Sequence, residues 1–381
     1  MGDTMQKKLT VLILSFVMLF NMQICAGALS VSAQSAVLIE ASTGKILYEN
    51  NAYAKMPMAS TTKIMTAVTV LENTVLTDTV TVSAQAAATE GSSMYLKSGE
   101  KITVLELLYG LMLSSGNDAA NALAEYVGDS RENFAVLMNQ TADKIGMESS
   151  NFVTPSGLDD TKHYSTAYDM AKLAAYALEN DVFKKIVSTR SITVGEGEDT
   201  HYLANHNKLL SRYKYCIGVK TGYTMKSGRC LVSAAEKDGV RLIAVTLNDR
   251  NDWADHIEML DYGFTCCEYA KFSDKAETFT LPVAGIGTTT VTEFKPFGKI
   301  LFGSEVCSVT RVVEMPRFLY PPVYRGTVVG YSNYYINGEL AESIEILADS
   351  DVGEAKELSF WGKFAKWFAD ILLTERNKRY G

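Results

Sequence analysis

The sequence predicts an α+β fold: a five-stranded, largely antiparallel sheet flanked by helices, followed by a small all-β domain and a C-terminal amphipathic helix. Three observations predict this arrangement. β-rich hairpin patterns lie near both ends of residues 34–270, helical periodicity fills the middle of that segment, and helical periodicity is absent from residues 276–350. Helices inserted between strands that pair with each other are typical of an α+β domain.

The sheet is expected from three β-rich segments. Residues 35–50 form two runs around a glycine-containing turn, and residues 229–248 form two runs around Asp238-Gly239, a strong two-residue hairpin signal. Residues 215–222 supply a fifth strand before the second hairpin. The strands therefore come from both ends of the segment, and most of the helices lie between them in the sequence.

The helices are expected where apolar residues recur at helical spacing. Thr166 and Asp169 also form a capping box, a reciprocal pairing of side chains and backbone that starts many helices. The apolar stripes lie at residues 64–71, 104–111, 134–145, 170–177 and 253–264. The last stripe is expected to close the domain.

The N-terminus has the pattern of a leader sequence. Residues 1–28 run from lysines through an apolar stretch at 9–20 to small residues, which is the order found in a secretory signal peptide. The apolar stretch is too short to span a bilayer comfortably. Cleavage is expected after Ala28 or after Ala33, so the protein is expected to be exported.

The C-terminal part of the chain differs from the rest. Residues 276–350 are short β-rich runs broken by glycine, proline and asparagine, which predicts a small all-β domain. Residues 357–381 place aromatic side chains on one face of a helix and lysines on the other. Such a helix suits the interface of a bilayer, and the same pattern also fits a helix docked on the protein's own core. We expect a peripheral anchor at the outer face of the cytoplasmic membrane.

Composition argues against several classes of function. The 381 residues are 47% hydrophobic and 21% charged, and the net charge of -8 argues against a nucleic-acid partner. The four histidines have no metal-ligand spacing, so the sequence shows no pattern of a metal site. Five cysteines remain after the leader at irregular spacing, which predicts buried thiols rather than a disulfide framework. They are Cys216, Cys230, Cys266, Cys267 and Cys307.

A Ser-x-x-Lys pair at the start of a helix is the first candidate for catalysis. The chain contains four such pairs, and only Ser60 and Lys63 open an apolar helix. Residues at i and i+3 share a helix face, so the Lys63 amine can approach the Ser60 hydroxyl. Ser60 is also expected to cap this helix. The other pairs lie in a hairpin turn or in polar stretches: Ser42 and Lys45, Ser98 and Lys101, and Ser211 and Lys214.

A serine hydroxyl is a poor nucleophile unless a base takes its proton. Lysine can be that base when burial and a neighbouring positive charge lower its pKa, so that free amine exists at neutral pH. The sequence offers such a cation in Lys220, which begins the chain's single Lys-Thr-Gly on a predicted strand. Gly222 lacks a side chain, so a peptide-like substrate could lie close against that strand. Ser115 and Asn117 follow a predicted helix, where polar side chains can project from a loop.

The order Ser-x-x-Lys, Ser-x-Asn, Lys-Thr-Gly resembles the superfamily of penicillin-binding proteins and serine β-lactamases. Within it, the chain looks like the low-molecular-weight D-alanyl-D-alanine carboxypeptidases over nearly its whole length. The stretches that carry the likeness are "GSSMYLKSGE", "LMLSSGNDAANALAEYVG", "NFVTPSGLDD", "HYSTAYDMAKLAAYAL" and "VKTGYT". The resemblance implies a β-lactamase/transpeptidase-like catalytic domain at residues 34–270.

The resemblance also implies a role for each site residue. Ser60 would be the acylated nucleophile and Lys63 its base, while Ser115 relays a proton to the leaving amine and Asn117 orients Lys63. Lys220 and Thr221 would bind the terminal carboxylate of a peptidoglycan stem peptide ending in D-Ala-D-Ala. The backbone amides of Ser60 and Tyr223 would form the oxyanion hole. β-Lactams would acylate Ser60 as covalent inhibitors, and no metal or cofactor would be needed.

Other functions of the same fold remain alternatives. A class A β-lactamase would carry Glu-x-x-Leu-Asn between Asn117 and Lys220, and no such stretch lies there. A class C enzyme would carry Tyr-x-Asn as its middle motif, whereas Tyr-Ser-Asn at 331–333 follows the Lys-Thr-Gly. A peptidoglycan DD-endopeptidase shares the motifs and stays open. A non-catalytic wall-binding module would leave all three motifs unexplained.

Overall fold

A computed structural model describes residues 14–17, 29–271, 277–293, 298–303 and 308–353. The chain divides into two compact units. The larger unit comprises residues 22–269 and 300–303, and the smaller unit comprises the rest. The predicted anchor at 357–381 lies outside the described residues.

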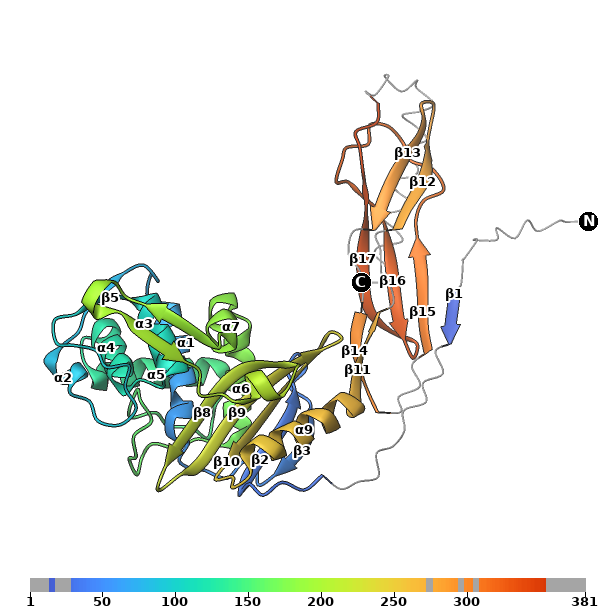
Figure 1. The fold of residues 1–381 in the computed structure, drawn as a ribbon. Coiled ribbons are helices and arrows are strands. Elements are labelled where there is room, and N and C mark those ends of the chain that lie inside the picture. The colour runs from blue at the N-terminus through green and yellow to red at the C-terminus, as the bar shows by residue number, and fades with distance from the viewer. Residues whose placement is uncertain (1–13, 18–28, 272–276, 294–297, 304–307, 354–381) are drawn as a thin grey trace, which may run out of the picture. The chain divides into compact units, whose positions relative to one another are not determined.

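The larger unit is built on a five-stranded antiparallel sheet with the order β3-β2-β10-β9-β8 (Figure 1). The N-terminal hairpin joins the later hairpin because β2 pairs with β10 along its whole length. The strands are β2 Ser35–Glu40, β3 Ile46–Asn50, β8 Cys216–Thr224, β9 Gly228–Lys237 and β10 Val240–Leu247. The α+β prediction is therefore confirmed.

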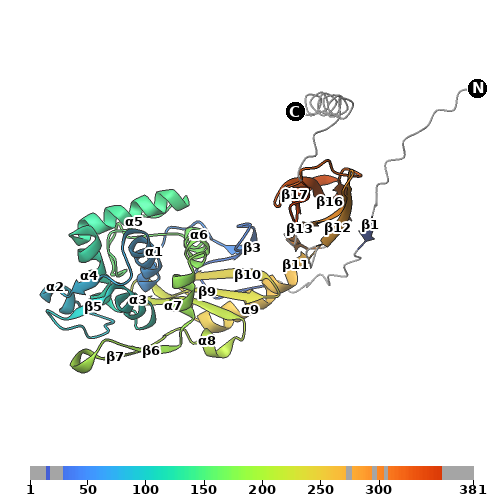
Figure 2. The same cartoon turned by 90° about the horizontal axis from the view of Figure 1, so that it is seen from above.

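Helices cover both faces of this sheet (Figure 2). One face packs on α1, α6 and α7, and α3–α5 extend the same core behind them, whereas the other face packs on α9. The bounds are α1 Lys63–Asn73, α2 Ala84–Ala87, α3 Val104–Leu113, α4 Asn117–Gly128, α5 Arg131–Ile145, α6 Ala167–Leu178, α7 Asp181–Ser188, α8 Leu209–Arg212 and α9 Asp252–Cys266. Alternate residues of β2 enter the two cores: Val37 and Ile39 face the larger one, whereas Ala36 and Leu38 face α9.

Short two-stranded sheets and 3-10 turns complete the larger unit. Two of these elements border the site described below, namely the turn η1 Ala59–Thr62 before α1 and the hairpin of β6 and β7. Another two-stranded sheet joins β4 to β5, and a further one joins β11 to β14, whose residues belong partly to each unit. The bounds are β4 Thr79–Thr81, β5 Lys101–Thr103, β6 Ser191–Val194, η2 Gly197–Asp199, β7 His201–Ala204, β11 Cys267–Lys271 and β14 Gly298–Phe302.

The predicted capping box at Thr166 forms only in part. The Thr166 hydroxyl accepts a hydrogen bond from the Asp169 backbone N–H at 3.0 Å. The Asp169 carboxylate instead accepts bonds from the Ser149 backbone N–H at 3.0 Å and the Ser150 hydroxyl at 2.8 Å. Asp169 therefore ties the connection before α6 to the helix instead of closing the box.

The smaller unit is a six-stranded antiparallel sheet with the order β1-β15-β16-β17-β13-β12, and its described residues contain no helix. Leu281, Val291 and Ile346 form the centre of one small core. The strands are β1 Leu14–Val17, β12 Glu277–Val283, β13 Gly287–Glu293, β15 Ser308–Glu314, β16 Val328–Ile336 and β17 Glu339–Ala348. Across the described part of both units, no helix is long and apolar enough to cross a membrane.

Candidate active site

Ser60 lies on the tight turn that leads into α1. The turn η1 places Ser60 three residues before the first residue of α1, and Thr62 occupies the N-cap position of α1 without a side-chain capping bond. The prediction that Ser60 caps the helix is therefore wrong. Ala59, immediately before Ser60, has a left-handed backbone with φ of 46°, a conformation that is uncommon for residues other than glycine. The serine is thus presented by a constrained turn rather than by a regular helix end.

Lys63 meets Ser60 from inside the protein. The Lys63 side chain is fully buried, and its Nζ lies 3.0 Å from Ser60 Oγ. The same Nζ donates to Asn117 Oδ1 at 2.8 Å and to the Ser156 carbonyl oxygen at 2.7 Å. Three acceptors fix the amine in one position, beside the hydroxyl whose proton it would take.

Burial and charge act together on the protonation of Lys63. Desolvation lowers the Lys63 pKa well below its ordinary value, the positive charge of Lys220 lowers it further, and the carboxylate of Asp118 acts in the opposite direction. Burial also lowers the pKa of Lys220, to about 7. The structure therefore supplies the two conditions under which a lysine can hold free amine near neutral pH: desolvation and a neighbouring cation.

Strand β8 brings Lys220, Thr221 and Gly222 to the Ser60 turn. A Cβ atom added to Gly222 would lie only 3.0 Å from the Ser60 backbone nitrogen, which is tighter than ordinary contact. Glycine at position 222 therefore lets the strand approach the Ser60 turn closely. The sequence predicts that Gly222 makes room for substrate, whereas in the structure it makes room for the backbone of Ser60. β8 ends the sheet order, so its outer edge can pair with an extended peptide. Tyr223, next along this strand, is 66% exposed.

The loop between α3 and α4 delivers Ser115 and Asn117. Ser115 is buried and has a left-handed backbone with φ of 59°. Asn117 begins α4, accepts the bond from Lys63, and donates from Nδ2 to the Glu90 carbonyl oxygen at 2.7 Å. Lys63 thus contacts both Ser60 and Asn117, and Ser115 lies two residues before Asn117 in the chain.

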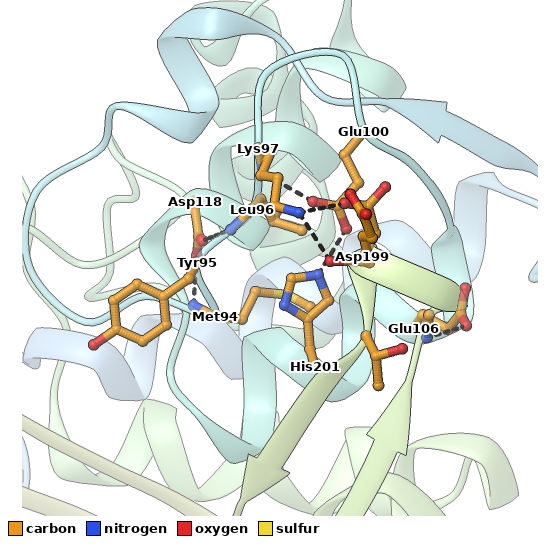
Figure 3. Close-up of polar contacts among 12 residues, drawn as sticks. Met94, Tyr95, Leu96, Lys97, Glu100, Glu106, Asp118, Asp199 and His201 are labelled. Carbon is orange, nitrogen blue, oxygen red and sulfur yellow. Dashed lines mark hydrogen bonds and ion pairs between the residues drawn. The ribbon is translucent and has the colours of Figure 1, made fainter.

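Asp118 is a residue of the site that the sequence did not suggest. Its carboxylate is fully buried and accepts bonds from Ser93 Oγ at 2.6 Å, the Met94 N–H at 3.1 Å and the Leu96 N–H at 3.0 Å. Figure 3 shows these two backbone groups directed at Asp118. Tyr95, between them, has φ of 68° and is exposed. Asp118 therefore clamps a strained loop beside Asn117.

A second set of contacts joins that loop to the β6–β7 hairpin (Figure 3). Lys97 forms an ion pair with Asp199 at 2.7 Å, and buried Glu100 lies 2.7 Å from His201 Nε2. The loop is therefore held from two sides, by α4 and by the hairpin.

Ser156 is the other residue that sequence reasoning missed, because it acts through its backbone carbonyl. The adjoining Pro155 carbonyl accepts from Thr66 Oγ1 at 2.6 Å, which fixes the segment against α1. A Cβ on Gly157 would lie 2.0 Å from the Ala59 carbonyl oxygen, so glycine is required where the two loops cross. Ser156 lies in "NFVTPSGLDD", one of the stretches that resemble the family. The resemblance did not single out Ser156, because any residue type can accept a hydrogen bond through its backbone carbonyl.

The buried histidines and thiols make no hydrogen bond to Ser60, Lys63 or Asn117 in the described structure. His163 supports the site by contacting Thr62. His163 Nε2 lies 2.8 Å from Thr62 Oγ1, and burial lowers the His163 pKa to about 4. His256 is enclosed between Ser233 and Thr246, where burial lowers its pKa to about 3. Four cysteines among the described residues are free thiols, whereas Cys307 lies outside those residues. No group of three or more metal-ligating side chains is placed to hold a metal within the described ranges.

Comparison with known proteins identifies the family. The family model described as D-alanyl-D-alanine carboxypeptidase (peptidase family S11) matches residues 22–251. The D-alanyl-D-alanine carboxypeptidase DacF of Bacillus subtilis is 33% identical over 87% of this chain and 90% of its own length. DacC of Escherichia coli is also 33% identical, over 89% of this chain and 90% of its own.

Solved structures show the same relationship. The D-alanyl-D-alanine carboxypeptidase DacD from Francisella tularensis aligns with a TM-score of 0.62 and 27% identity, covering 89% of this chain and 97% of that one. The Streptomyces K15 DD-transpeptidase aligns with a TM-score of 0.58 and 34% identity over 62% of this chain and 98% of its own. These matches confirm the resemblance drawn from the motifs. The chain belongs to the D-alanyl-D-alanine carboxypeptidase family of serine peptidases.

Proposed function

We propose that Ser60 is the residue of this serine-type D-Ala-D-Ala carboxypeptidase that becomes acylated. The observation that carries the proposal is the contact of 3.0 Å between Ser60 Oγ and the amine of buried Lys63. The substrate is a peptidoglycan stem peptide ending in D-Ala-D-Ala. Incubation with such a pentapeptide should release free D-alanine and leave a tetrapeptide, and failure of the wild-type protein to release D-alanine would refute the proposal.

The reaction would proceed in two steps. Neutral Lys63 takes the proton of Ser60 Oγ, and Oγ attacks the carbonyl carbon of the penultimate D-alanine. The backbone N–H groups of Ser60 and Tyr223 stabilise the oxyanion. The C–N bond then breaks, and the leaving amine receives a proton through Ser115. Water hydrolyses the resulting ester and restores the Ser60 hydroxyl. β-Lactams would enter the same first step and inhibit the enzyme.

The terminal carboxylate of the substrate would bind Lys220 and Thr221. Because burial lowers the Lys220 pKa to about 7, the free enzyme loses this cation as the pH rises through neutrality. We expect kcat/KM for the pentapeptide to fall above about pH 7. In Lys220→Arg the guanidinium stays protonated, so this falling limb should disappear from the pH profile, even if the maximal rate is lower. An unchanged falling limb in that variant would contradict the assignment.

Asp118 would set the lower end of the active pH range. Its charge raises the Lys63 pKa, so Asp118→Asn should lower that pKa and move the rising limb of kcat/KM to lower pH. Asp199→Asn is the matched control, because it loosens the same loop at the exposed Lys97 ion pair without removing charge beside Lys63. If Asp118→Asn lowers the rate equally at every pH, Asp118 acts only as a structural clamp.

The family comparisons do not favour the two alternative activities. The relatives described above that cover most of this chain are named as carboxypeptidases, and neither β-lactamase nor endopeptidase appears among those names. A slow turnover of penicillin would still be consistent with a carboxypeptidase, because the acyl-enzyme can hydrolyse. Rapid penicillin turnover without D-alanine release would instead indicate a β-lactamase.

We also propose export with removal of residues 1–28, strand β1 included, rather than 1–33. Leu29 and Val31 pack on the core beneath α9, and Ser32 Oγ lies 2.7 Å from a carboxylate oxygen of Asp249 and 2.9 Å from one of Asp255. Cleavage after Ala33 would remove these contacts and leave two neighbouring carboxylates without them. N-terminal sequencing of the exported protein should begin at Leu29, and a sequence beginning at Gln34 would contradict the proposal.

Attachment to the membrane is proposed through residues 357–381. The support is the sequence pattern of aromatic and cationic faces in that segment. Its two tryptophans, Trp361 and Trp367, provide a direct test with membrane-embedded quenchers, described below.

A further inference from the structure

One end of the smaller unit exposes a group of large apolar side chains. Ile286 is 49% exposed, Phe318 45%, Tyr320 52% and Tyr324 62%. Ile286 lies in the turn between β12 and β13, and the three aromatic residues lie in the connection between β15 and β16. We call these four residues the aromatic end. Exposed apolar side chains that gather in one place usually mark an interaction surface.

The connection that carries these aromatics is firmly held. Leu319 N–H donates to the Pro282 carbonyl at 2.8 Å, and Ala284 N–H donates back to the Leu319 carbonyl at 2.9 Å. Val323 and Val352 exchange backbone bonds of 3.1 and 2.8 Å. The rings of Phe318 and Tyr320 contact each other edge to face, with centroids 5.1 Å apart. The aromatic end is therefore a built surface on the sheet.

The chain leaves the described residues at this same end. A Cβ on Gly353 would lie 2.2 Å from Ile286 and 3.4 Å from Pro321, so Gly353 adjoins the aromatic end. Residues 354–356 separate it from the proposed anchor. Four extended residue steps span at most about 14 Å. If the anchor lies in the membrane interface, Gly353, which adjoins the aromatic end, therefore lies within about 14 Å of the first residue of the anchor.

The charges at this end nearly cancel. Arg317 and Arg325 are exposed, and Asp351 accepts the Arg325 backbone N–H at 2.7 Å. Asp349 accepts from Thr292 Oγ1 at 2.9 Å. With exposed Glu314 at the end of β15, the described residues here give two cations and three carboxylates, so this end has no strong positive field to attract an anionic partner. Aromatic rings, by contrast, are the side chains that favour the boundary between lipid headgroups and acyl chains.

We propose that the aromatic end inserts into the lipid headgroup interface beside the anchor, so that the smaller unit rests on the membrane at a second point. This inference rests on the proposed membrane attachment. The partner of the aromatic end is the lipid bilayer. Aromatic side chains, rather than charged ones, make the contact with it.

The test uses the exported full chain and vesicles of phosphatidylethanolamine and phosphatidylglycerol that contain bromine-labelled lipid. Quenching of Trp361 and Trp367 in a Trp253→Phe chain, which lacks the third tryptophan, reports the anchor itself. A Tyr320→Trp variant in a Trp253→Phe/Trp361→Phe/Trp367→Phe background reports the aromatic end, and a Leu340→Trp variant in that background is the control. Leu340 is also exposed, but it is the second residue of β17 and lies about 26 Å along the strand from Ala348.

We expect the tryptophan at position 320 to be quenched and the tryptophan at 340 to keep its emission. Phe318→Ser/Tyr320→Ser/Tyr324→Ser should weaken vesicle partition about tenfold, with little dependence on salt, whereas Leu340→Ser should leave it unchanged. Quenching of the anchor without quenching at position 320 would overturn this inference alone. Absence of quenching at the anchor would overturn the membrane proposal and this inference with it. A blue-shifted tryptophan at 320 before lipid is added would show that the protein itself covers the aromatic end, and would also overturn it.

Discussion

Ser60→Ala is expected to reduce D-alanine release by at least about 10⁴-fold, because no other hydroxyl can take the place of the acylated oxygen. The substitution removes one atom from a half-exposed side chain whose hydroxyl accepts a single bond, from Lys63. Its effect on folding should therefore be small, and the circular dichroism spectrum and Tm should remain close to those of the wild type.

The chain provides a matched control for this substitution. Ser211 also precedes a lysine by three residues, but it is exposed and its hydroxyl donates to the Lys208 carbonyl at 3.0 Å. Ser211→Ala should retain wild-type activity. Release of D-alanine by Ser60→Ala at a rate near that of Ser211→Ala would show that the nucleophile lies elsewhere.

Lys63→Met is expected to reduce acylation by about 10³- to 10⁴-fold, since methionine has a similar length but cannot accept a proton. The rate should be measured as single-turnover acylation by a fluorescent penicillin, which isolates the first step. Lys214→Met is the matched control, because Lys214 is the exposed lysine of the Ser211 pair.

Lys63→Met could lose activity because the fold is weakened or because the base is missing, and the experiment must separate these two causes. Methionine leaves Asn117 Oδ1 and the Ser156 carbonyl without the donor they have in the wild type, so some loss of Tm is expected. Lys63→Gly with added small primary amines provides the distinction. Acylation that rises with amine concentration and with pH would show that a free amine is the missing group. No rescue in a folded variant would contradict the role of Lys63 as the base.

The sequence predicts most of the fold because its strand and helix periods are clear. The hairpin signal at Asp238-Gly239 and the apolar stripes correspond to β9, β10 and the helices of the larger unit. Errors arose where tertiary contacts override local rules. Ser60 does not cap α1, because Ala59 turns the chain into a 3-10 turn first. Asp169 does not close its capping box, because Ser149 and Ser150 occupy its carboxylate.

The sequence predicted those residues of the candidate site that act through a reactive or charged side chain in a recognisable motif. Lys220 was expected to act on Lys63 from about 160 residues away, and the structure places its charge where it lowers the Lys63 pKa. The Ser156 carbonyl and the clamp at Asp118 were not predicted. A backbone acceptor has no distinctive residue type, and an aspartate after Asn117 looks like an ordinary first-turn residue of a helix.

The measurement that tests the account most directly is the location of a penicillin adduct. Trypsin cleavage after Lys55 and Lys63 yields the peptide 56–63, in which Ser60 is the single serine. After brief exposure of the wild-type protein to benzylpenicillin, mass spectrometry should find the covalent adduct on this peptide and, by fragmentation, on Ser60. No adduct should form with Ser60→Ala. An adduct on another peptide, or one that persists in Ser60→Ala, would contradict the account.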